Sequence, residues 1–157
     1  MRSPQGFSRT DTTVVLGLIA IIAVILLATL NPAARFQEAR DAKRWSDAEN
    51  ILEAIKQAQI ENGGSYPASV ANTAANKLYQ IGTAESGCDT GCGDFVTEPT
   101  CVNLTDLVNQ GQLTEVPLAP GMYSDAMTGY YLIRKLSGSL EVGACDPGQT
   151  ENISVSR

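Results

Sequence analysis

The sequence predicts an α+β fold in which a long N-terminal α-helix, transmembrane in its first half and amphipathic in its second, packs on a small antiparallel β-sheet. Three observations predict it. An apolar run covers residues 14–30, a charged segment with one apolar stripe follows it, and short strand-like segments separated by turn residues lie near the C-terminus. The chain of 157 residues is long enough for one compact domain with an appendage.

The apolar run at residues 14–30 departs from the strongly apolar set only at Gly17 and Thr29. About 20 helical residues, at about 1.5 Å each, span the hydrocarbon core of a bilayer. A buried core helix normally keeps a polar stripe. A cleaved secretory signal has a shorter apolar region and ends in a small-residue cleavage site. The run therefore predicts a membrane-spanning helix, which we place within residues 7–34.

Residues 35–62 make up the amphipathic half of the expected helix, because Ala, Glu, Lys, Arg and Gln dominate them and are good helix formers. Their apolar residues recur at spacings of three and four and make one stripe: Trp45, Ala48, Ile51, Leu52, Ile55 and Ala58. Trp45 begins this stripe and is expected in the core rather than at a membrane interface. Gly63 and Gly64 end the helix, and Pro32 predicts a kink or an unwound turn between its halves.

The remaining chain, residues 63–157, is expected to form a small globular domain that packs on this stripe. Its expected elements are helices at 70–81 and 104–110 and strands at 130–136, 140–144 and 153–155. The Ser137-Gly138 pair fits a tight hairpin turn between the first two strands. One face of the second strand carries the apolar residues Leu140, Val142 and Ala144. This alternation predicts an antiparallel sheet with its inner face on the helix.

The four cysteines all lie in this domain: Cys88, Cys92, Cys101 and Cys145. The gaps between them hold three, eight and 43 residues, whereas a zinc site would have paired two-residue spacings. Disulfides are therefore expected, which places the domain outside the cytoplasm. Cys88 and Cys92 can close a small loop, and Cys101 and Cys145 would join the loop region to the sheet, so we predict these two pairs. Crossed pairs such as Cys88 with Cys101 stay geometrically open.

The charge and composition argue against several functions. With 17 acidic and 11 basic residues, the net charge of -6 disfavours bulk nucleic-acid binding. The basic cluster is expected to be a solvated helix face with local ion pairs rather than a DNA or headgroup site; it comprises Arg35, Arg40, Lys43 and Arg44. Asp125 in GMYSDAMTG is weak support for calcium, so an ordinary loop is favoured. The chain has no histidine and no glycine-rich phosphate loop, so we expect neither an enzyme nor a cofactor or metal site.

The N-terminal region resembles the type IV pilins and the pseudopilins of type II secretion. A leader MRSPQG precedes Phe7, a carboxylate follows four residues later at Asp11, and an apolar helix, an amphipathic helix and a cysteine-bearing domain come after it. The resemblance covers residues 6–67, including the stretch ARFQEARDAKRWSDAENILEAIKQAQIENGGSYP. Three features depart from the pattern. The helix-breaking proline of many pilins falls a little earlier than Pro32. Aspartate replaces the usual glutamate, and Ser8, Arg9 and Thr10 occupy positions that are normally apolar or small.

The resemblance implies how the chain is processed and assembled. A prepilin peptidase would remove residues 1–6 by cleaving after Gly6, and the new amino terminus on Phe7 would be methylated. The membrane-anchored subunit, with residues 63–157 outside the cytoplasm, would then join like copies and related pilins in a fimbrial or pseudopilus filament through an inner-membrane assembly platform. A carboxylate near hydrocarbon is costly unless it is paired. Asp11 is therefore expected to meet the amine of Phe7 of a neighbouring subunit and to set the axial register.

Two alternatives stay open beside this interpretation. The first is an unprocessed single-pass membrane protein whose outer domain binds a ligand or a partner. The second is a minor pilin for DNA uptake, which the net charge disfavours.

Overall fold

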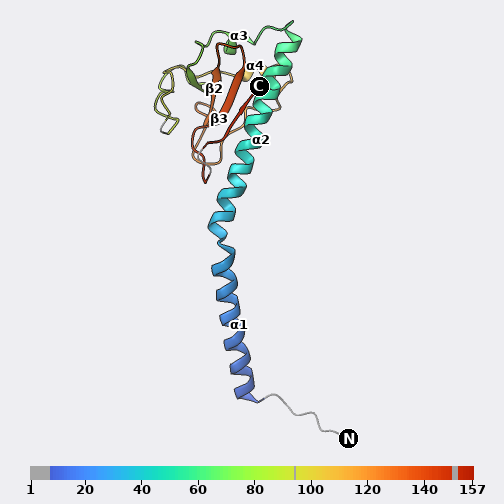
Figure 1. The fold of residues 1–157 in the computed structure, drawn as a ribbon, viewed down its shortest axis with the longest axis vertical. Coiled ribbons are helices and arrows are strands. Elements are labelled where there is room, and N and C mark those ends of the chain that lie inside the picture. The colour runs from blue at the N-terminus through green and yellow to red at the C-terminus, as the bar shows by residue number, and fades with distance from the viewer. Residues whose placement is uncertain (1–7, 94, 150–151) are drawn as a thin grey trace. The chain divides into compact units, whose positions relative to one another are not determined.

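The computed structural model describes residues 8–93, 95–149 and 152–157. Within these ranges the helices are α1 (Arg9–Leu30), α2 (Pro32–Glu61), α3 (Ala68–Ala71) and α4 (Thr105–Asn109) (Figure 1). The strands are β1 (Leu78–Gln80), β2 (Tyr130–Arg134), β3 (Leu140–Ala144) and β4 (Ser154–Ser156). The predicted combination of a long N-terminal apolar helix with a small antiparallel sheet is confirmed. Contacts divide the chain into two units, Met1–Phe36 and Gln37–Arg157, and we call the second the globular unit.

The first helix, α1, ends where Asn31 adopts a left-handed conformation, with φ 37° and ψ 69°. Pro32 follows and has no backbone N–H to continue the hydrogen-bond ladder. Pro32 instead opens α2, because its fixed φ suits the first helical position and its missing N–H costs nothing there. The predicted interruption at Pro32 is therefore confirmed, and the unwound residue is its neighbour Asn31.

The C-terminal end of α2 is closed by its two glycines, as predicted. The Gly63 N–H donates to the Ile60 carbonyl (3.1 Å), and the Gly64 N–H donates to the Gln59 carbonyl (2.8 Å). These are the two bonds of a Schellman motif. Gly63 has a φ of 67°, a left-handed value that glycine adopts without strain.

The buried face of α2 differs at its start from the predicted stripe. Trp45 is 41% exposed, so the expectation that it lies in the core is wrong. The face begins instead with charged residues and then continues with the predicted apolar ones and with Ala54, which was not predicted. Its members are Asp41, Arg44, Asp47, Ala48, Ile51, Leu52, Ala54, Ile55 and Ala58. Asp41, Arg44 and Ala48 are spaced by three and four residues, so they lie along one side of the helix and leave Trp45 on its flank.

The four strands form one antiparallel sheet in the order β1-β2-β3-β4. The predicted hairpin between β2 and β3 is confirmed, since Tyr130 pairs with Ala144 and Arg134 pairs with Leu140. Its turn is closed by the Lys135 N–H, which donates to the Ser139 carbonyl (2.8 Å). The three residues between them end in a left-handed glycine (φ 85°), the geometry of a three-residue hairpin loop.

One predicted helix is wrong. Residues 70–81 contain only the last residues of the short α3, and Leu78–Gln80 form β1. Although Ala, Lys, Leu and Gln are helix formers, the pairing of Leu78 with Ile133 and of Gln80 with Tyr131 extends the sheet instead. The short helix α4 confirms the prediction for residues 104–110, and Gly111 follows it with a φ of 83°.

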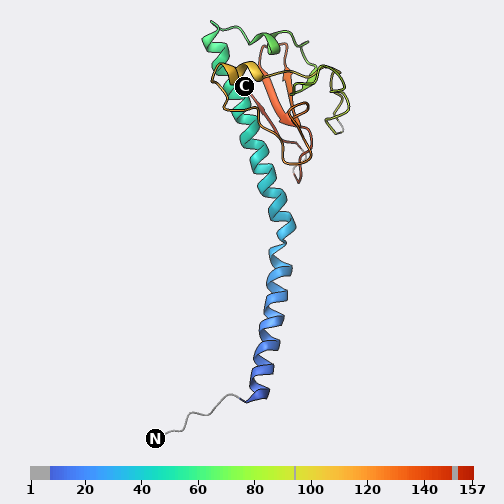
Figure 2. The same cartoon turned by 180° about the vertical axis from the view of Figure 1, so that it is seen from behind.

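The main core lies between α2 and the inner face of the sheet, which run alongside each other in Figure 1 and, seen from behind, in Figure 2. Leu140, Val142 and Ala144 are fully buried in it, as predicted, together with Ile51 and Ile55 from α2. A second, smaller cluster lies on the sheet's other face, where loop residues cover the strands. It comprises Cys92, Tyr131 and Cys145 with the partly buried Leu78, Phe95 and Ile133.

Candidate functional site

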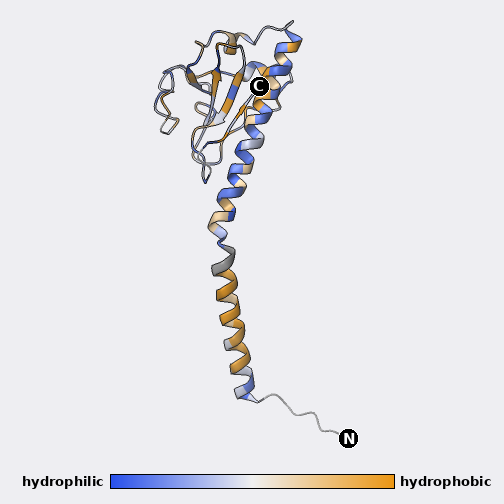
Figure 3. Cartoon of the chain, in the orientation of Figure 1, coloured by the Kyte–Doolittle hydropathy of each residue, from blue (hydrophilic) through white to orange (hydrophobic). Residues whose placement is uncertain are grey.

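The surface of α1 is apolar and exposed. Its large apolar side chains from Val14 to Leu27 are 45% to 67% exposed, and Figure 3 shows the hydrophobic colour along this helix. By length and composition alone, this helix is long and apolar enough to cross a membrane. A soluble domain rarely exposes so large an apolar surface unless a membrane or another protein covers it.

A polar collar, residues 8–13, forms the start of α1. The backbone N–H of Ser8 donates to Oδ2 of Asp11 (3.2 Å), which is half of a capping box because Asp11 is the third residue of the helix. The hydroxyl of Thr12 donates to the Ser8 carbonyl (3.3 Å), and that of Thr13 donates to the Thr10 carbonyl (2.9 Å). The collar hydroxyls thus bond within their own helix.

Gly6 and Phe7, the residues predicted to flank the cleavage site, lie outside the described residues. Asp11 is described: it is exposed, at the third position of α1, and shares the helix with one other charged residue, Arg9. These two residues and the apolar surface after them form the candidate assembly site. Chemically, the site offers one anion, one cation and a long apolar surface for contact with lipid or with another helix.

In the globular unit, the basic cluster is only partly as predicted. Local pairs do form, since Arg44 Nη1 donates to Asp41 Oδ1 (2.8 Å) and Lys43 Nζ donates to Asp47 Oδ2 (2.6 Å). The solvated face expected for Arg44 is wrong, because the side chains of Asp41 and Arg44 are 6% and 4% exposed. Arg44 also donates through Nη2 to the Pro120 carbonyl (3.0 Å). The charge pattern alone did not show that two loops would close over this pair.

Asp41 ties the C-terminal segment to α2. The backbone N–H groups of Gly148 and Gln149 donate to its two carboxylate oxygens, each at 2.8 Å. Burial opposes the ionisation of Asp41, but these two bonds and the bond from Arg44 outweigh burial and hold the pKa of the carboxyl below its ordinary value. The ionised carboxylate is therefore the form that fits this site.

A second polar contact joins α2 to the sheet. The hydroxyl of Tyr130, at the start of β2, donates to Asp47 Oδ2 (2.7 Å) across the core. Burial and then this bond to Asp47 raise the pKa of Tyr130 far above its ordinary value. The tyrosine therefore stays protonated and acts as a fixed donor.

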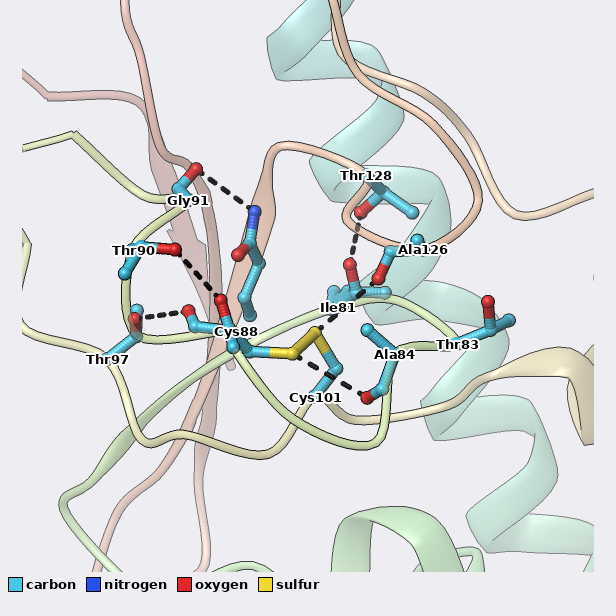
Figure 4. The surroundings of a disulfide bond; sticks show 12 residues. Ile81, Thr83, Ala84, Cys88, Thr90, Gly91, Thr97, Cys101, Ala126 and Thr128 are labelled. Carbon is cyan, nitrogen blue, oxygen red and sulfur yellow. Dashed lines mark hydrogen bonds between the residues drawn. A yellow bond between two sulfur atoms is a disulfide. The ribbon is translucent and has the colours of Figure 1, made fainter.

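The two predicted disulfide pairs are wrong, because the bridges join Cys88 with Cys101 and Cys92 with Cys145. Figure 4 shows the first bridge, where Thr97 donates through its hydroxyl to the Cys88 carbonyl (2.6 Å). The Cys88 N–H donates to the Pro99 carbonyl (3.1 Å), so the backbone of Cys88 lies against the segment that leads into Cys101. Cys92 lies instead in the small cluster with Cys145. The prediction failed because it weighed loop length and not this hydrogen bonding.

A groove of about 1000 Å³ lies in the globular unit. Its lining comes from α2, from residues 112–118 and from the segments around Thr83 and Asn103, and it includes the carboxylates of Glu53, Glu115 and Asp125. Within the described ranges, no three His, Cys, Asp or Glu side chains are grouped to hold a metal. The Asp125 carbonyl accepts hydrogen bonds from the N–H (2.9 Å) and hydroxyl (3.1 Å) of Thr83, in a loop beside this groove.

No family model, curated protein or solved structure matches the chain. The function is therefore inferred from the chain's own residues.

Proposed function

We propose that this chain is a structural subunit of a type IV pilus or pseudopilus filament, made as a membrane-anchored precursor and cleaved after Gly6. The observation that carries the proposal is α1, an exposed apolar helix of 22 residues whose charged residues, Arg9 and Asp11, both lie in its first turn. Such a helix needs an apolar environment along its length and a polar contact at its start.

The helix would occupy two environments in turn. Before assembly, lipid covers its apolar side chains, and in the filament the helices of other copies replace the lipid. Because lipid tails are as apolar as leucine, this exchange gains little hydrophobic free energy, and close packing and polar pairs decide which helices associate. The polar start of α1 therefore carries the specificity of assembly.

Asp11 has a defined task in this scheme. Its bond to the Ser8 N–H is 3.2 Å long, beyond the usual distance for a charge-assisted bond, so it is easily exchanged for a stronger partner. The amine that cleavage creates on Phe7 is such a partner when it comes from a neighbouring copy. Pairing neutralises both charges and fixes the axial position of one helix against the next.

The globular unit would lie outside the cytoplasm in this scheme. Two disulfides are typical of proteins in oxidising compartments. Its partners would be further copies of the chain and related pilins, the prepilin peptidase and the assembly platform. No nucleic-acid partner is proposed, because the chain has a net charge of -6.

The test compares Asp11→Ala with Asp11→Glu in cells that assemble the wild-type chain. Both variants are expected to insert into the membrane normally, since removing a charge does not hinder insertion. Asp11→Ala should be at least tenfold depleted from filaments, whereas Asp11→Glu, which keeps the carboxylate, should incorporate. Mass spectrometry of filament material should find Phe7 as the methylated first residue. An intact Met1 in assembled material, or normal incorporation of Asp11→Ala, would contradict the proposal.

The groove in the globular unit favours a second candidate function. A volume of about 1000 Å³ is at the upper end of the range for ligand sites. An unprocessed single-pass membrane protein could present this groove to a ligand outside the cell. That function predicts Met1 at the amino terminus of the membrane-bound chain and no effect of Asp11→Ala on its activity.

A further inference from the structure

We infer that Arg9 of one copy pairs with Asp11 of the next copy, so that Arg9 is a second assembly residue beside Asp11. The inference rests on the proposed filament and names a partner group for its carboxylate. It follows from the placement of the two charges on α1.

Arg9 and Asp11 are the charged residues of α1, and both are exposed. All residues of the helix from Val14 onward are uncharged, and its large apolar side chains from Val14 to Leu27 are exposed. When such helices pack against one another, each charge at their start must find an opposite charge or lose favourable solvation.

The partners available within the chain differ between the two residues. Asp11 has the Ser8 N–H as a local donor (3.2 Å), and the hydroxyls of Thr12 and Thr13 bond to carbonyls of the same helix. Arg9 forms no ion pair or side-chain hydrogen bond with any part of the chain from Ser8 onward that the structure describes. The guanidinium is thus the group of the collar that needs a partner from outside.

Helix stability does not explain Arg9. It is the first residue of α1, where the positive end of the helix dipole repels a cation and favours an acidic residue. The stability of its own helix therefore gives no reason for a cation at this position.

The geometry excludes a pair within one helix and permits a pair between helices. Residues two apart in an α-helix are separated by about 200° around the axis and about 3 Å along it, so their side chains leave nearly opposite sides. Arg9 can therefore meet one neighbour while Asp11 meets another. A contact that joins two different patches of identical subunits is heterologous and repeats without closing, which generates an open filament.

The chemistry of the two groups allows this pair beside the amine of Phe7. A guanidinium presents a planar fork of donors that matches a carboxylate at two points. An ionised carboxylate has about four acceptor positions on its two oxygens. Asp11 can therefore accept from a guanidinium and from an amine together, and the fork adds directional control that an amine lacks.

The experiment uses charge exchange between full-length copies. Arg9→Asp alone and Asp11→Arg alone are each expected to lose at least tenfold in filament incorporation, because each variant has like charges at both positions. Co-expressed, the two variants are expected to recover part of the incorporation that each loses alone, since every contact between positions 9 and 11 then joins an acid to a base. Recovery stays incomplete because the Asp11→Arg copies lack the carboxylate that meets the amine of Phe7. Membrane level and the mass of the amino-terminal peptide, measured for each variant, ensure that only correctly inserted and cleaved chains are compared.

Two further variants at Arg9, one neutral and one cationic, separate this inference from the proposed function. Arg9→Gln should be depleted at least tenfold, and Arg9→Lys, which keeps the charge, should incorporate better. If Arg9→Gln assembles like the wild type while Asp11→Ala does not, the amine alone neutralises Asp11, and the inference fails while the proposed function stands. Incorporation of the co-expressed pair no better than that of either variant alone would also overturn it. A wild-type chain that forms no filament would overturn both.

Discussion

Replacing Asp41 by asparagine should destabilise the globular unit strongly. The carboxylate accepts three hydrogen bonds, from Arg44 Nη1 and from the N–H groups of Gly148 and Gln149, each at 2.8 Å. Asparagine keeps the shape but turns one oxygen into a donor, so at least one of these groups loses its acceptor. It also removes the charge that neutralises Arg44, whose side chain is 4% exposed.

The expected loss is about 3 to 5 kcal/mol, the usual cost of removing one partner from a buried ion pair. The total free energy of unfolding of an ordinary domain is about 5 to 15 kcal/mol, so the variant should keep only a small part of its stability. The full chain in detergent would be unfolded with urea and followed by near-ultraviolet circular dichroism. Asp89→Asn, the same change at an exposed loop residue, is the matched control.

The pH dependence gives a second measurement on the same pair. Because the folded pKa of Asp41 is lowered, its contribution to stability is complete above the unfolded value of about 3.9 and is lost as the pH falls through the folded value. The wild type should therefore lose stability below about pH 4 more steeply than Asp41→Asn does. A loss for Asp41→Asn no larger than that for Asp89→Asn, or equal acid slopes, would refute this account of the pair.

Three further expectations concern the sheet and its covering loop. Replacing Cys92 and Cys145 by serine should lower the free energy of unfolding by about 4 kcal/mol in the chain-entropy model, because this bridge has a sequence separation of 53. Replacing Cys88 and Cys101 should lower it by about 3 kcal/mol, because the separation is 13. Non-reducing peptide mapping checks the pairs, and urea unfolding checks the order of the two losses. Gly143→Ala should lower the free energy of unfolding by about 1 to 3 kcal/mol, since its Cβ would clash with the side chain of Tyr131 and come within 2.6 Å of the Ile153 carbonyl oxygen; thermal unfolding unchanged from the wild type would contradict this. Tyr130→Phe should lower the free energy of unfolding by about 1.5 to 3 kcal/mol through the lost hydrogen bond to Asp47. An equal loss in Asp47→Asn, with no further loss in the double variant, would confirm that the two residues act as a pair.

Much of the fold could be predicted from patterns of neighbouring residues in the sequence. The apolar period of α2 from Ala48 to Ala58, the alternation in Leu140–Ala144 and the Ser137-Gly138 turn are set by neighbouring residues, and the structure confirms them. The end of α2 at Gly63 and Gly64 could be predicted equally well, because the positive φ needed there depends on the local backbone alone. The apolar character of α1 needed no tertiary information at all.

The features that the sequence did not predict depend on distant partners. β1 exists because β2 pairs with it, some 50 residues away in sequence, despite helix-forming residues. Trp45 was misplaced because a buried Asp41–Arg44 pair occupies the position that an apolar stripe would have given to the aromatic ring. In the sequence, nothing distinguishes Asp41 from the other acidic residues of this charged segment. Only the approach of Gly148 and Gln149 makes it a buried acceptor.

The two disulfides overlap along the chain, which determines how the protein responds to proteases. One bridge encloses the segment from Cys88 to Cys101 and the other the segment from Cys92 to Cys145. A single peptide-bond cut anywhere between Cys88 and Cys145 therefore falls inside at least one covalent ring, and both fragments stay joined. Such a nicked chain keeps its strands β2 and β3 attached to α2 until a reductant opens the ring. A single cut in the loops between Cys88 and Cys145 would thus not release the C-terminal strands from α2.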